Sequence, residues 1–298
     1  MRRTAIFLAV AVAAIDLGTY VWNEFRLAAA VGSVISFGVG AFASRLVLSL
    51  AFVLPWVAGA ALFWRGRRAL GAAVIVPTAV LTAPGVLFLG QWLGDLVDVG
   101  GSAGAWIELG AATTMWVAAI VAGVVAWRSR PAAGTRLEAP GVGNVYVVLA
   151  FLAWLPMVLV STHFLTPGAT GTDLAARPFY EFIWEDSGGL GAAVGISEAL
   201  LFGSLLLLGP LVRRDAAGAV VTVIAFPALV REVQTILEVA SERLVVSTPA
   251  SYLGVVGLLG VVVIGITWLR QGAPRAKAAA RTAASVPSDE DEPADEER

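Results

Sequence analysis

Residues 250–269 read ASYLGVVGLLGVVVIGITWL, twenty consecutive residues without a charge. In an α-helix, about twenty apolar residues cover the roughly 30 Å hydrocarbon core of a bilayer. A helix satisfies all its backbone hydrogen bonds internally, so it is one of the few structures that lipid tolerates. The stretch therefore predicts a transmembrane helix and points to the fold of the whole chain.

The composition agrees with this reading. Of 298 residues, 58% are hydrophobic and 14% are charged, and the mean hydropathy is +0.82. Soluble domains carry about 25% charged residues. A chain this apolar cannot cover a water-facing surface, so we expect an all-α, polytopic transmembrane helix bundle over residues 1–270.

Scanning outward from 250–269 for further apolar stretches of about twenty residues predicts eight spans in all. Their expected bounds are 4–22, 46–64, 69–93, 105–127, 143–163, 190–212, 216–238 and 250–269. The first span also resembles a signal peptide, but its apolar run continues to Trp22, so we expect it to be retained. Residues 27–43 are apolar too, yet a ninth span would place the basic cluster at 65–68 outside. We expect 27–43 to form a re-entrant or interfacial helix.

The basic residues set the expected orientation. Most of the 20 lysines and arginines fall in segments that lie on one side of the membrane if both termini are cytoplasmic. Arginine predominates and cysteine is absent, which is typical of a high-GC or halophilic prokaryote and suggests the plasma membrane. Residues 271–298 end in an acidic run, and we expect a disordered cytoplasmic tail whose basic start contacts anionic lipids.

The two halves of the chain share a layout. In each half a long outer segment follows the first span, a short basic turn joins the next two, and a short outer loop precedes the fourth. This favours two parallel four-helix repeats, a plan that some transporters use. The alternative is that eight spans with short inner loops look alike without any repeat.

Several classes of chemistry are excluded by residue counts. The chain has no cysteine and a single histidine, His163, so thiolate and multi-histidine metal centres cannot form within it. The sequence shows no metalloprotease or nucleophile-elbow motif and no Walker-type loop. We predict no cofactor, no metal and no nucleic-acid partner.

Burying an ionisable residue inside a membrane span costs free energy, so each such residue is a candidate for a functional role. They gather in the expected outer half of the bundle, and Arg231, Gln234 and Glu238 share one face of their helix. A Glu198–Arg231 ion pair between adjacent spans is the sharpest expectation. The alternatives are a solute- or proton-binding cavity and a purely structural ion pair. The candidate site comprises Asp16, Glu108, His163, Glu198, Arg231, Gln234 and Glu238.

One local stretch carries a family resemblance. Residues Ile196–Leu206 read ISEALLFGSLL. This resembles the Ser-Glu-Ala-x-Phe-Phe stretch in a span of subunit III of haem–copper oxidases. The resemblance implies an accessory membrane subunit without its own redox centre, with Glu198 in a helix core.

Three functions stay open at this stage. The polar cluster favours a gradient-driven transporter of a small solute, ion or proton. A stripe of small residues in the sixth span (Gly191, Gly195, Ala199 and Gly203) and the subunit III resemblance favour an accessory or scaffolding subunit that binds other membrane subunits. A lipid-active membrane enzyme has no specific support.

Overall fold

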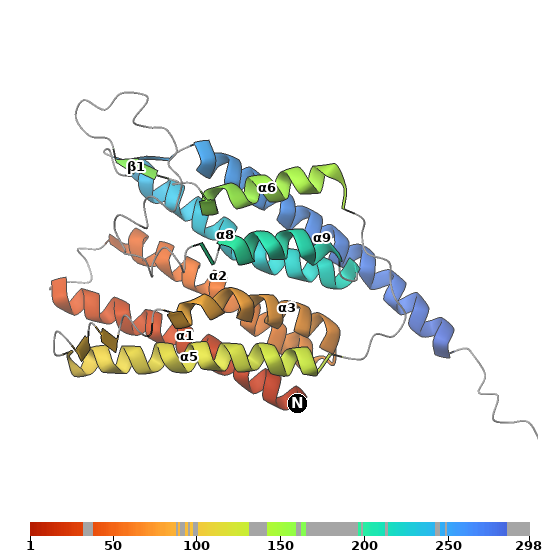
Figure 1. Cartoon of the computed structure of the whole chain (residues 1–298), viewed down its shortest axis with the longest axis horizontal. Coiled ribbons are helices and arrows are strands. Elements are labelled where there is room, and N and C mark those ends of the chain that lie inside the picture. Colours follow the sequence, from red (N-terminus) through yellow and green to blue (C-terminus); the bar gives the residue numbers. More distant parts are fainter. Residues whose placement is uncertain are drawn as a thin grey trace, which may run out of the picture.

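The computed structural model describes most of the chain. The described residues are 1–31, 38–87, 89, 93–94, 96–97, 101–130, 142–158, 162–164, 196–197, 199–211, 214–241, 245–247 and 249–284. Helices dominate them, as the sequence predicts (Figure 1).

Six helices among the described residues are long and apolar enough to cross a membrane. The spanning segments are Arg2–Trp22, Leu46–Trp64, Arg68–Val86, Ala103–Arg128, Ala216–Gln234 and Ala250–Gln271. They lie in α1 (Arg2–Val31), α2 (Gly38–Trp64), α3 (Arg68–Thr82) with η2 (Ala83–Leu87), α5 (Ala103–Arg128), α8 (Arg214–Ser241) and α9 (Pro249–Ala284). Large apolar side chains are exposed along them, such as Leu54, Val117 and Val256, as expected where lipid is the solvent.

The fifth predicted span is shorter than expected, and the sixth is described only in part. The apolar parts of this region are Asn144–Pro156, within α6 (Asn144–Val158), and Ala199–Leu211, which ends in the 3-10 turn η3 (Gly209–Leu211). The prediction of a helix through residue 163 was wrong. Residues Thr162–Phe164 instead form strand β1, which pairs antiparallel with β2 (Val245–Ser247). Extended pairing suits the β-branched residues in both segments.

The re-entrant helix predicted for 27–43 is replaced by the ends of two long helices. α1 continues to Val31 and α2 begins at Gly38, so both extend beyond their apolar spans. Residues 32–37 lie outside the described part. The placement of these helix ends in or on the membrane stays a prediction, because hydropathy alone does not separate the two.

Two further boundaries differ from the prediction. After Thr82, Pro84 and Gly85 tighten the chain into the 3-10 turn η2, so α3 itself ends before residue 93. At the other end of the chain, α9 continues as helix to Ala284, where disorder was expected from residue 271. The reason is composition: the segment AKAAARTAA is rich in alanine, the strongest helix former.

The helices form two groups, each with its own buried core. The first core contains side chains of α1, α2, α3 and α5, including Val12, Phe63 and Ile75. The second contains side chains of α6, the helix Ala199–Leu211, α8 and α9. We call these groups the N-terminal and C-terminal halves. Figure 1 shows them as two layers, and they meet where α8 packs against α2 and α3.

Short polar contacts tie the ends of each half together. In the N-terminal half, Arg2 donates from Nε to the Phe63 carbonyl at 2.8 Å and from a second nitrogen to the Trp64 carbonyl. These are the last carbonyls of α2, which lack partners within their own helix. Gly66, with φ of +79°, then makes the tight turn into α3 that a side chain would strain. α1 and α2 are thereby fixed as antiparallel neighbours.

The C-terminal half is held by hydrogen bonds and by glycines. Tyr146 donates to the Leu206 carbonyl at 2.6 Å, and Trp154 donates to the Ala199 carbonyl at 2.9 Å. α9 approaches α6 so closely that a Cβ at Gly257 would lie 2.6 Å from the Leu149 oxygen. Glycine at such points lets helix backbones pack directly in lipid.

We predict that Gly257→Ala destabilises the protein whereas Gly110→Ala does not. The new methyl group at 257 meets the backbone of α6 at Leu149 and Ala153, while a Cβ at Gly110 meets nothing within 4 Å. Overpacking of this kind costs about 1–3 kcal/mol, and the alanine at 110 gains helix propensity worth up to about 1 kcal/mol. Unfolding in detergent measures both. Equal stability of the two variants would contradict the close approach of α9 to α6.

Candidate functional site

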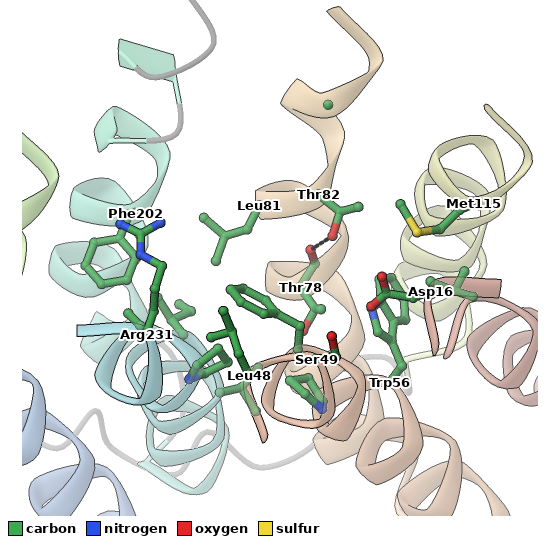
Figure 2. A pocket seen from close by; sticks show the side chains of 18 of the residues that line it. Asp16, Leu48, Ser49, Trp56, Thr78, Leu81, Thr82, Met115, Phe202 and Arg231 are labelled. Atoms are coloured by element: carbon green, nitrogen blue, oxygen red, sulfur yellow. Dashed lines mark hydrogen bonds between the residues drawn. The ribbon is translucent and has the colours of Figure 1, made fainter. Parts of the chain in front are cut away.

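A cavity of about 500 Å³ lies between the two halves. Its walls come from α1, α2, α3, η2 and α5 on one side and from the helix Ala199–Leu211 and α8 on the other. Such a volume matches that of small-molecule sites, which are commonly found where helical groups meet. Figure 2 shows this cavity from close by.

Two charged side chains stand at different ends of the cavity. Asp16 enters from α1 in the N-terminal half and Arg231 from α8 in the C-terminal half. In Figure 2 they lie on opposite sides, with Thr78 and Leu81 between them. A bound molecule would therefore meet an acidic group and a basic group at separate points.

The surface between these charges is largely apolar and aromatic. It includes Phe52 and Trp56 of α2, Trp116 of α5, and Phe202 from the opposite half. Gly85 makes room for the Trp116 indole: a Cβ at that position would clash with the ring. Apolar walls with a few placed polar groups are typical of ligand sites.

The neutral polar groups in the cavity are on α2 and α3. Ser49 and Thr78 line it, as does Thr82. Thr78 donates its hydroxyl to the Val74 carbonyl at 2.8 Å, and Thr82 donates to the Thr78 carbonyl at 2.9 Å. Their protons are thus committed to the helix backbone, so these two hydroxyls offer acceptor oxygens to a ligand.

Glu232, the residue after Arg231, was not among the candidate site residues predicted from the sequence. Its carboxylate Oε1 is 3.7 Å from an Arg231 terminal nitrogen. The residue is 2% exposed, and the fully buried Ser251 of α9 hydrogen-bonds to it. The other oxygen, Oε2, is buried and has no hydrogen-bond partner among the described residues. A buried carboxylate thus shares the arginine that lines the cavity.

The sequence shows Glu232 as a charged residue within a span, but its position on the helix favoured a different set of residues. The helical periodicity of α8 places Glu232 next to the polar face of Arg231 and Gln234, not on it. That neighbouring face packs on α9. Any charge within a span, whatever its face, marks a candidate.

The structure brings together two of the seven predicted site residues, Asp16 and Arg231. Glu108 lies one turn into α5 and Gln234 one turn after Arg231; both are partly buried, and neither lines the cavity. Glu238 belongs to the last turns of α8, where its side chain is not described.

The remaining two predicted residues cannot be placed as side chains. Glu198 lies outside the described residues, and so the expected Glu198–Arg231 pair stays a prediction. The backbone of His163 pairs with Val246 in the β1–β2 ladder, while its side chain lies outside the described part. Within the described residues, no group of three or more histidine or carboxylate side chains is arranged to hold a metal ion.

Comparisons with known proteins give no identity. No protein-family model matches the chain, and searches of curated proteins and of solved structures found no significant match.

We predict that Arg231→Gln is rescued in part by adding Glu232→Gln. Removing the arginine leaves an ionised carboxylate buried without its cation. Because the Arg231 side chain is 43% exposed, water weakens this effect, and we expect a loss of roughly 1–2 kcal/mol. The double variant is expected to recover a substantial part of it in a detergent unfolding assay. Simple addition of the two single-variant losses would show that the pair is not coupled.

Proposed function

We propose that the chain is a gradient-driven transporter of a small solute, with its binding site in the cavity between the two halves. The observation that carries the proposal is the cavity itself. It is large enough for a small organic molecule, and both halves contribute to its walls. Each half has a separate core, so the halves can tilt against each other without either core being repacked.

The proposal includes eight membrane passes arranged as two parallel four-helix repeats. Each half contains four apolar helices, and in each half the third helix (α3 or α8) packs against the fourth (α5 or α9). In each half the first helix also packs against the fourth. α3 and α8, the corresponding third helices, meet at the centre. This pattern is what a repeat about an axis along the membrane normal would produce.

We further propose a multi-pass protein of the plasma membrane with both termini cytoplasmic. The basic turn at Arg65, Arg67 and Arg68 supports this orientation, since arginine concentrates in cytoplasmic loops. In this orientation Asp16 and Arg231 lie in the outer half of the bilayer.

The positions of two prolines support a movement of the cavity walls. Pro55 of α2 and Pro227 of α8 both line the cavity. A proline inside a helix removes one backbone hydrogen bond and bends the helix. Two such points at the junction of the halves would allow the walls to open on one side.

An accessory subunit of a membrane complex is the alternative function. Phe202, within the segment that resembles subunit III, lies in the cavity wall. In an accessory subunit the cavity would be a packing defect sealed from water, which the next experiment distinguishes.

We predict that Ser49→Cys reacts with a membrane-impermeant thiol reagent added outside, while Leu50→Cys does not. The natural chain has no cysteine, so each variant carries a single thiol. The two positions are adjacent and lie at the same depth, but Ser49 lines the cavity and Leu50 is 46% exposed on the outer surface of the bundle. The transporter predicts a wet Ser49 site and a lipid-facing Leu50 site.

Alternating access adds a second requirement. Thr78→Cys, deeper in the cavity, is expected to react from outside in intact cells and from inside in inverted vesicles. Protection of both Ser49→Cys and Thr78→Cys from reagent on either side would rule out the transporter and favour the accessory subunit.

A further inference from the structure

Arg231 takes part in two environments at once. Its side chain lines the cavity (Figure 2), and it also pairs with the buried Glu232. We propose that Glu232 is the proton-binding site of the transporter. When Glu232 binds a proton, the guanidinium group of Arg231 exchanges its ion pair with Glu232 for one with the anionic group of an organic solute in the cavity. This inference rests on the proposed function and names its coupling ion and substrate class.

Glu232 is suited to bind a proton because few groups hold its charge. Arg231 is the charged residue that interacts with it, and Ser251 supplies a hydrogen bond from α9. The buried oxygen Oε2 has no partner among the described residues, so it is free to accept a proton. A buried carboxylate with one partner cation depends strongly on that cation.

The other elements packed on α8 add few ionisable groups near Glu232. α9 offers Tyr252 beside Ser251, and η3 and β2 contain no ionisable residue. On α3 the charged residue is Arg68, ten residues before the cavity residue Thr78 and therefore about 15 Å away along the helix. On α2 it is Arg45, one turn before the cavity residue Ser49. Across the cavity stands Asp16, so the experiment must separate its protonation from that of Glu232.

Charge balance requires that the solute and the proton bind together. With Glu232 ionised, Arg231 is already neutralised by its neighbour. A second carboxylate arriving from a solute would place two negative charges on one guanidinium in a region of low dielectric, which is unfavourable. One proton on Glu232 removes the excess charge. The guanidinium contact then passes to the solute, and the site keeps the same net charge.

The cavity walls indicate the rest of the solute. Aromatic side chains from both halves, Trp56 and Phe202 among them, favour an apolar or aromatic body. The carboxylate of that body would face Arg231. Asp16 lies on the opposite side, where an amino group on the same molecule would fit. An aromatic carboxylate supplies the first two features, and one that also carries an amino group at the far end of its ring supplies all three.

The test measures binding and proton uptake together. Purified full-length protein in lipid nanodiscs is titrated with benzoate in weak buffer, and a pH dye reports protons while Trp56 and Trp116 report binding by fluorescence. We expect about one proton taken up per benzoate bound, and binding that weakens about tenfold per pH unit above the range where Glu232 is protonated. 4-(Aminomethyl)benzoate and benzylamine are titrated in parallel; tighter binding of 4-(aminomethyl)benzoate than of benzoate assigns an amino-group site at Asp16, and the opposite order assigns a plain carboxylate.

The variants assign the proton to one residue. Glu232→Gln mimics the protonated state, so it should bind benzoate with little pH dependence and no proton uptake. Glu108→Gln, the same substitution at a glutamate that does not line the cavity, should behave as the natural chain does. Arg231→Gln should lose benzoate binding at every pH.

Three results would overturn the inference. The first is proton uptake that persists in Glu232→Gln but vanishes in Asp16→Asn. The second is tighter binding of benzylamine than of benzoate. The third is the absence of benzoate binding in both the natural chain and Glu232→Gln. Each would leave the proposed transport function to be judged by the thiol accessibility of Ser49→Cys and Thr78→Cys, which requires no ligand.

Discussion

The close contact of α8 with α9 fixes the position of the helix that carries Arg231 and Glu232. A Cβ at Gly218 would lie 2.5 Å from the Gly265 oxygen, so the two backbones touch without intervening side chains. That approach lets Ser251 of α9 reach Glu232 of α8. α8 also packs against α2 and α3, which makes it the helix through which the C-terminal half meets the N-terminal half. A change in the angle between α8 and α9 would therefore be felt at Glu232 and, through Arg231, at the cavity.

The arrangement also explains why polar residues gather where they do. Each half fills its own core with apolar side chains such as Ile75 and Leu258. The boundary between the halves is packed less completely, and the cavity lies there. Charged residues are costly in lipid but tolerated beside a polar cavity or a partner charge. Asp16 and Arg231 are at the cavity, and Glu232 has Arg231 as its partner.

Hydropathy predicted the membrane helices well but not their ends. It located α5 within two residues, because charge and polarity change sharply on both sides of that span. It failed at α6, where strand pairing between β1 and β2 competes with the helix, and at α9, where alanine extends the helix beyond the apolar run.

For the site, the sequence identified Asp16 and Arg231 as charged residues that are costly to place within a span. Their meeting in one cavity depends on the packing of α1 and α8 from different halves, and the importance of Glu232 depends on the contact with α9. Neither packing is encoded in a local pattern.

The central claim is that Glu232 exchanges Arg231 for a proton when an organic anion enters the cavity. Difference infrared spectroscopy measures this directly, because a protonated carboxylic acid has a carbonyl stretch that a carboxylate lacks. On addition of benzoate to the natural chain, the account predicts that such a band appears, and that it is missing from the same difference spectrum of Glu232→Gln. Benzoate binding without a new carboxylic-acid band, or with one that survives in Glu232→Gln, would contradict the account.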